Sequence, residues 1–159
     1  MKIQKKTMFF AILPLLWTAV IFSFSLQPAG VSAGMSGGIL QRVLDWFYAI
    51  TGVMLPADLM HTVIRKTAHF CEFFLLGTLS YQVAKGLWKS RWPALCYGAL
   101  VAVTDEVIQY FTGSGRAMRF ADMCLDTLGV AAAILVAAFL GKICAKRKHK
   151  NTKKEEKIA

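Results

Sequence analysis

The stretch from Arg65 to Glu72 places ionisable side chains at the start of an apolar run. Arg65, His69 and Glu72 fall within about 60° of one another on a helix, so they share one face. A histidine can act as a general base or nucleophile when a carboxylate one helical turn away orients its ring. An arginine beside this pair can bind a phosphate, bidentately where the geometry allows. The spacing therefore indicates acid–base chemistry beside a bound phosphate.

Two later segments carry polar groups in the same apolar setting. One lies near the end of the apolar run 92–111, and the other begins the run 121–141. In each segment the polar side chains share one face of a helix. Gly129 and Ala133 continue the second face, where small residues let a neighbouring helix approach closely. The polar residues are Asp105, Glu106 and Gln109 in the first segment, and Arg119, Asp122 and Asp126 in the second.

The elements that position these residues are predicted to be transmembrane helices. The chain has 159 residues, of which 56% are hydrophobic, and few soluble domains have this composition. A helix needs roughly 20 apolar residues to cross a bilayer. Four runs approach that length, and we expect them to be the spans: 8–26, 67–85, 92–111 and 121–141.

The Lys and Arg residues predict the orientation. With both termini in the cytoplasm, fourteen of the 19 basic residues lie on the inner side. Residues 1–7 are then a cytoplasmic N-terminus, 8–141 form the membrane domain, and 142–159 are a basic cytoplasmic tail predicted to be disordered. This topology brings the three polar segments to the outer end of their spans, at similar depth. We therefore expect them to form one shared site in the cell membrane.

The net charge of +10 does not indicate nucleic acid, because the chain has no nucleic-acid-binding motif and its lysines cluster where spans end. Membrane topology and attraction to anionic lipid head groups explain this charge. The predicted fold class is therefore an all-α membrane protein, a four-transmembrane-helix bundle with an outer interfacial amphipathic helix. We expect membrane lipids as partners and no nucleic acid.

The outer interfacial helix is predicted between the first two spans. The glycine-rich stretch 27–38 is expected to be a flexible loop. Residues 39–55 carry apolar side chains on one helical arc, which is typical of a helix that lies in the membrane interface. Pro56 is expected to end this helix, and Asp58 to cap the next one.

Two alternatives concern the same outer region. A basic start, an apolar stretch and Val31–Ala33 are also typical of a signal peptide with its cleavage site. Pro28 and the length of the spacer before that site argue against cleavage.

A disulfide between Cys71 and Cys124 is the second alternative, but the four cysteines form no Cys-x-x-Cys pair and have the pattern of free thiols.

The polar segments resemble the VanZ-like family of bacterial membrane proteins. The resemblance lies in residues 65–73, 105–111 and 115–129, and in Ser-Leu-Gln-Pro at 25–28, and it covers about Ile12 to Leu140. The family is named for resistance to the glycopeptide teicoplanin, and a relation to lipid head-group enzymes has been proposed for it. The residues that match its motifs are Arg65, Lys66, His69, Glu72, Asp105, Glu106, Gln109, Arg116, Asp122 and Asp126.

The residues and the resemblance together favour an enzyme that acts on a lipid phosphoester in the outer leaflet. Its substrate would be a phospholipid head group or a polyprenyl-linked envelope precursor. Lys66 is predicted to be an interface anchor. The predicted catalytic residues are His69, Glu72, Glu106 and Asp122, the phosphate-binding residues are Arg65, Arg116 and Arg119, and the supporting residues are Asp105, Gln109 and Asp126.

Other functions use the same residues differently. A non-catalytic binder of lipid, cell-wall precursor or glycopeptide would use the arginines without the His–Glu pair. A purely structural ion-pair network would only clamp the bundle. A proton-coupled transporter is disfavoured because the inner halves of the spans offer no polar path. His69 and the carboxylates could also bind Mg²⁺ or Mn²⁺, whereas one membrane histidine and scattered cysteines argue against structural zinc.

Overall fold

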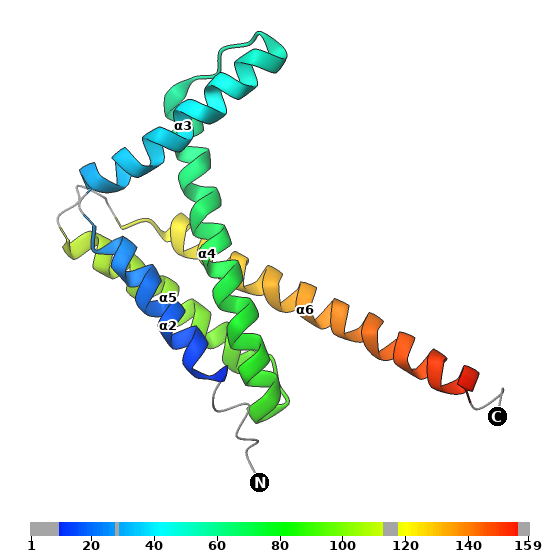
Figure 1. Ribbon diagram of the computed structural model, residues 1–159. Helices are drawn as coiled ribbons and strands as arrows, with labels where there is room; N and C mark the ends of the chain where they lie inside the picture. The colour runs from blue at the N-terminus through cyan, green and yellow to red at the C-terminus, as the bar shows by residue number, and fades with distance from the viewer. Residues whose placement is uncertain (1–9, 28, 113–117, 156–159) are drawn as a thin grey trace.

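The computed structural model describes residues 10–27, 29–112 and 118–155 (Figure 1). Over these ranges the chain is helical and forms no strand, which confirms the all-α prediction. The helices are α2 (Ile12–Ser25), α3 (Ala29–Thr51), α4 (Ala57–Trp88), α5 (Trp92–Phe111) and α6 (Phe120–Glu155).

Helices α4, α5 and α6 each contain one of the predicted spans, and the shorter α2 lies within the first predicted span, 8–26. Helix α5 matches the third run at both ends, and a proline in its first turn suits a helix start because its missing N–H has no intrahelical partner there. Helix α4 begins ten residues before the second predicted run and α6 continues well beyond the fourth. The predicted disorder of the basic tail is wrong as far as Glu155, because α6 extends to that residue.

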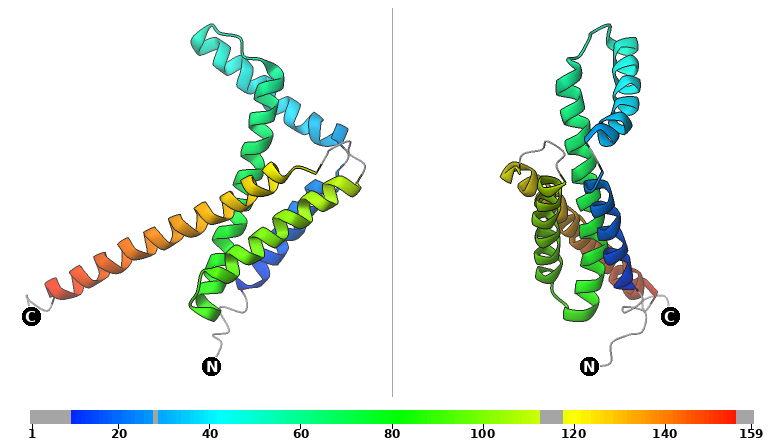
Figure 2. Two further views of the ribbon diagram at one scale, coloured as in Figure 1. Left: turned by 180° about the vertical axis from the view of Figure 1, so that it is seen from behind. Right: turned by 90° about the vertical axis from the view of Figure 1, so that its left-hand side faces the viewer.

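Helix α3 differs from its prediction at both ends. It begins at Ala29, so the flexible loop expected at 27–38 is wrong over 29–38. Each glycine costs a helix up to about 1 kcal/mol, but α3 packs beside the first half of α4 (Figure 2), and this packing opposes that cost. The helix ends at Thr51 because Gly52 adopts a left-handed conformation with φ of 68°, which glycine tolerates.

The predicted cap of α4 is also wrong. The N-cap residue is Pro56, in an extended conformation, and it makes no side-chain cap hydrogen bond. Asp58 lies within the first turn instead. At that position its negative charge still complements the positive end of the helix dipole.

The helices alternate in direction. Helices α2 and α5 run one way, while α4 runs the other way and α6 slants down and away from the end at which α5 finishes (Figures 1 and 2). Helix α2 contacts both α4 and α5. Trp17 Nε1 donates a hydrogen bond to the Glu72 carbonyl oxygen at 2.9 Å, and the Thr18 and Tyr97 hydroxyl oxygens are 2.8 Å apart. These contacts fix α2 against both neighbours.

The closest helix contact joins α4 to α6. A Cβ atom added at Gly77 would lie 2.8 Å from Val130 Cα, and one added at Gly129 would lie 2.8 Å from the Phe70 carbonyl oxygen. Both glycines therefore let two backbones meet where no side chain fits. The buried apolar residues around this contact include Phe73, Leu76, Val101, Ala102, Val130 and Ile134.

Large apolar side chains cover much of the outer surface of the bundle. Among the described residues, Phe120–Lys148 of α6 is the one segment long and apolar enough to cross a membrane, and α2 is apolar but shorter. The interior holds buried carboxylates instead, including Asp105 and Asp126. The exposed apolar residues include Ile12, Leu15 and Leu16 of α2, Leu100 and Phe111 of α5, and Leu128, Leu135 and Phe139 of α6.

We expect Gly129→Ala to lower the free energy of unfolding by about 1–3 kcal/mol, because the new methyl group overpacks the α4–α6 contact. Gly38→Ala in α3 is the matched control. Its added Cβ meets nothing within 4 Å, so we expect no loss and a gain of up to about 1 kcal/mol. Reversible unfolding in mixed micelles, followed by far-ultraviolet circular dichroism, measures both. Equal stability of the two variants would contradict the backbone-to-backbone contact.

Candidate functional site

A small pocket lies between α4, α5 and α6, near the start of α6. We call it the charged pocket, and it has room for little more than a water molecule or an ion. It brings together predicted site residues from all three later runs, far apart in sequence. Its lining residues are Arg65, Lys66, His69, Glu106, Asp122, Leu125 and Asp126.

The more exposed part of the charged pocket is formed by two basic residues and Asp122. Lys66 Nζ donates a hydrogen bond to Asp122 Oδ1 at 3.1 Å, and Arg65 Nη2 lies 3.9 Å from Asp122 Oδ2. Lys66 therefore bridges α4 to α6, and its predicted role as an interface anchor stays a prediction. The side chains of Arg65 and Lys66 are 33% and 43% exposed, so both can still reach a ligand from outside.

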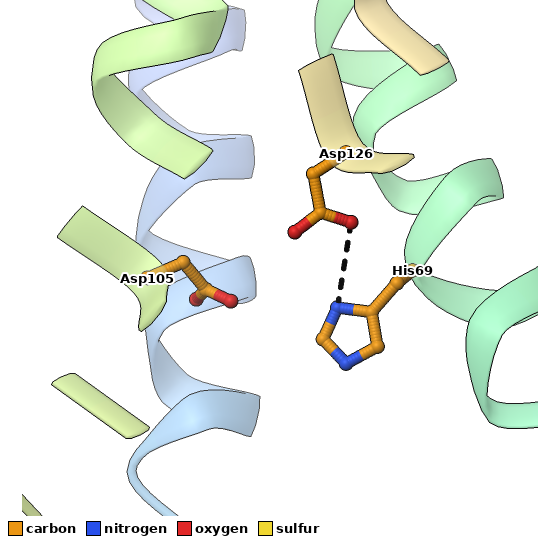
Figure 3. A group of neighbouring side chains, drawn as sticks. All are labelled: His69, Asp105 and Asp126. Atoms are coloured by element: carbon orange, nitrogen blue, oxygen red, sulfur yellow. Dashed lines mark ion pairs between the residues drawn. The ribbon is translucent and has the colours of Figure 1, made fainter. Parts of the chain in front are cut away.

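The deeper part contains His69 and Asp126. His69 Nδ1 lies 3.9 Å from Asp126 Oδ1, and the Asp126 side chain is 1% exposed. Figure 3 shows the Asp126 carboxylate directed toward the imidazole ring, with Asp105 facing the same space from α5. The structure thus places Asp126 beside His69 Nδ1, and the predicted role of Glu72 in orienting His69 stays a prediction.

Asp105 is held by two hydrogen-bond donors. Ser25 Oγ donates to Asp105 Oδ1, and Gln109 Nε2 donates to Asp105 Oδ2 at 2.7 Å. Gln109 Nε2 also lies 3.4 Å from Ser25 Oγ. All three side chains are buried, so this group fixes the Asp105 carboxylate and joins α2 to α5. Ser25 was not predicted as a site residue, and its only signal is its place in the Ser-Leu-Gln-Pro segment.

Glu106 and Arg119 meet through a backbone group. The Arg119 backbone N–H donates to Glu106 Oε2 at 3.0 Å, which ties the segment before α6 to α5. Arg119 is exposed and does not line the charged pocket, so its predicted phosphate-binding role stays a prediction. Arg116, the other predicted phosphate-binding residue, lies outside the described residues.

Glu72 lies one turn beyond His69 on α4 and is partly buried, but it does not line the charged pocket. Its negative charge nevertheless acts on Asp126, as do the charges of Asp105, Glu106 and Asp122. Five carboxylates therefore concentrate around one buried position. Among the described residues, Arg65 and Lys66 both form their ion pairs with one of the five, Asp122.

Comparison with known proteins identifies the group to which the chain is related. Residues 10–141 match the VanZ/LLP1 family. The chain belongs to this family. The VanZ/LLP1 match runs from the start of the described residues to the end of the apolar part of α6, so it includes every residue of the charged pocket. No curated protein and no solved structure matches.

We expect Ser25→Ala to destabilise this VanZ/LLP1 protein by about 1–3 kcal/mol, because a buried Asp105 oxygen loses its donor. Ser23→Ala is the control, since Ser23 is exposed and its hydroxyl donates only to the Val20 carbonyl within α2. That change should stay within about 0.5 kcal/mol of the wild type. Thermal unfolding in the same detergent measures both. Similar melting temperatures for both variants would show that the Ser25–Asp105 bond contributes little.

Proposed function

We propose that this VanZ/LLP1 protein is a multi-pass membrane protein that acts on lipid head groups or lipid-linked envelope precursors at the extracytoplasmic face. Helices α2, α4, α5 and α6 would form four spans. The distribution of side chains supports this arrangement. Apolar side chains face outward, while Asp105, Glu106 and Asp126 are buried between helices. A bilayer makes this pattern favourable, because polar groups then meet one another instead of hydrocarbon.

The positions of the basic residues support cytoplasmic termini. Lys85, Lys89 and Arg91 lie where α4 ends and α5 begins, and further lysines crowd the end of α6. Figure 1 places the α4–α5 connection opposite the end at which α2 and α5 finish and α6 begins. The positive-inside rule puts the basic end in the cytoplasm. The charged pocket, near the start of α6, would then open toward the outer leaflet.

The charged pocket is the observation that carries the proposed reaction. It places Arg65 and Lys66 at its exposed side, one helical turn from His69. The two basic groups would bind the phosphate oxygens of a lipid in competition with Asp122. His69, with its Nδ1 side toward Asp126, would accept a proton from the attacking water or hydroxyl, and Glu106 or Asp122 would serve as the acid.

The products of such a reaction are a cleaved or exchanged head group and a remaining lipid. Phospholipids and polyprenyl-linked precursors share the phosphoester that the pocket would recognise. An effect on glycopeptide susceptibility would follow from action on an envelope precursor. A non-catalytic binder would use Arg65 and Lys66 in the same way but would release no product.

The test uses the purified full chain in lipid nanodiscs that contain phospholipids and a polyprenyl-diphosphate precursor. Mass spectrometry follows loss or exchange of the head group. We expect product from the wild type and a rate at least about 100-fold lower for His69→Ala, the usual scale for losing a general base. His61→Ala is the matched control, because His61 is on the same helix outside the charged pocket and should leave the rate unchanged.

Two outcomes would contradict the enzymatic proposal. Undiminished turnover in His69→Ala would remove His69 from the chemistry. Absence of product from the wild type, together with retention of one lipid that is lost in the Arg65→Ala and Lys66→Ala variants, would identify a binding protein instead.

A further inference from the structure

Asp126 is a buried carboxylate with an unusual lack of hydrogen bonds. Its side chain is 1% exposed, and neither oxygen has a hydrogen-bond partner among the described residues. The negative charges of Asp105, Glu106, Asp122 and Glu72 all act on it. A buried carboxylate without hydrogen bonds costs several kcal/mol. Such a side chain needs either a proton or a cation, and the residues that face it distinguish the two.

The facing residues are metal-ligand types. His69, Asp105 and Asp126 each offer one nitrogen or oxygen atom, and these three atoms lie within 4.8 Å of one another. Figure 3 shows the three side chains converging from α4, α5 and α6 on one space. An octahedral ion with ligands at about 2.1–2.2 Å holds their atoms about 3–4.4 Å apart. Shifts of a few tenths of an ångström would bring the three atoms onto one ion.

We propose that His69, Asp105 and Asp126 form a divalent-cation site at the bottom of the charged pocket. Two carboxylates supply two negative charges for a doubly charged ion, which would compensate the buried charge of Asp126. Carboxylates favour Mn²⁺ and Mg²⁺, whereas an imidazole favours transition metals. Mn²⁺ satisfies both preferences and is the ion to which we commit. The charged pocket, which His69 and Asp126 line, has room for a water molecule that would be a further ligand.

The hydrogen bonds of Asp105 fit the role of a ligand. Asp105 Oδ1 accepts a hydrogen bond from Ser25, and Asp105 Oδ2 accepts one from Gln109. Metal-binding carboxylates are commonly held in this way by neighbouring donors, which fix their orientation before the ion arrives. Ser25 and Gln109 would thus position a ligand without touching the metal.

The experiment measures Mn²⁺ binding directly. The full chain, stripped with EDTA, is placed in phosphatidylcholine nanodiscs, whose zwitterionic lipid limits background binding. Electron paramagnetic resonance follows the signal of free Mn²⁺ during titration. We expect one saturable site per chain, and affinity at least about 100-fold lower in Asp126→Asn, since even a residue that only supports a ligand contributes about 10–100-fold. Asp45→Asn, at an exposed aspartate of α3, is the matched control and should bind as the wild type does.

Thermal unfolding separates loss of the site from loss of the fold. Mn²⁺ should raise the melting temperature of the wild type and leave that of Asp126→Asn unchanged. In EDTA, Asp126→Asn should melt at or above the wild-type temperature, because asparagine keeps the shape without the buried charge. A wild type that binds neither Mn²⁺ nor Mg²⁺ nor Zn²⁺ at millimolar concentration overturns the proposal. The proposal is also overturned if Asp126→Asn binds Mn²⁺ as tightly as the wild type. It is overturned as well if Asp45→Asn loses as much Mn²⁺ affinity as Asp126→Asn.

This inference does not depend on lipid turnover. With the cation bound, His69 would be a metal ligand with its proton on the other ring nitrogen, so it would not act as the general base in that state. Saturable Mn²⁺ binding without any product would support the cation site and refute the enzymatic function. Lipid turnover in EDTA by a protein that binds no cation would support the enzymatic function and refute the cation site.

Discussion

The backbone contact between α4 and α6 sets the geometry of the charged pocket. Gly77 and Gly129 leave no room for side chains, so the two helices meet in one register. Asp126 lies one turn before Gly129 on α6, and this register brings it opposite His69. One turn earlier, the same register brings Asp122 to Lys66. Polar groups between apolar helices have few alternative partners. The close contact at the two glycines and the ion pairs between α4 and α6 therefore favour the same register of the two helices.

The pocket divides its charges by depth. Near the exposed side, the single carboxylate of Asp122 pairs with both Arg65 and Lys66, and all three side chains keep some contact with solvent. Farther in, Asp126 accepts no hydrogen bond from the described residues, and Asp105 accepts hydrogen bonds from Ser25 and Gln109. These buried polar groups make the bundle less stable than an apolar core of the same shape would. Such a loss of stability is typical of residues that serve function rather than folding.

The helices with strong local signals were predictable from the sequence. Helix α5 has a proline at its start and an apolar run of the right length, so both ends were correct. The start of helix α3 was not predictable in this way, because glycine is a poor helix former. Its packing against α4, which opposes the cost of the glycines, depends on residues that are distant in the sequence. For the site, helical periodicity predicts that His69 and Glu72 share one face of α4, but it cannot predict that Asp126 of α6 lies beside His69 across the interface. Ser25 was missed because its partner, Asp105, is distant in sequence.

The uninterrupted course of α6 has a mechanical consequence. The helix has 36 residues, and at 1.5 Å per residue it is about 54 Å long, well beyond the roughly 30 Å of a bilayer core. Its contact with α4 at Gly129 lies about 14 Å from the near end and about 39 Å from the far end. The helix therefore extends much farther beyond Gly129 on its basic side than on the side that bears Asp122. If this straight helix tilted about that contact, its basic end would move nearly three times as far as the end that bears Asp122.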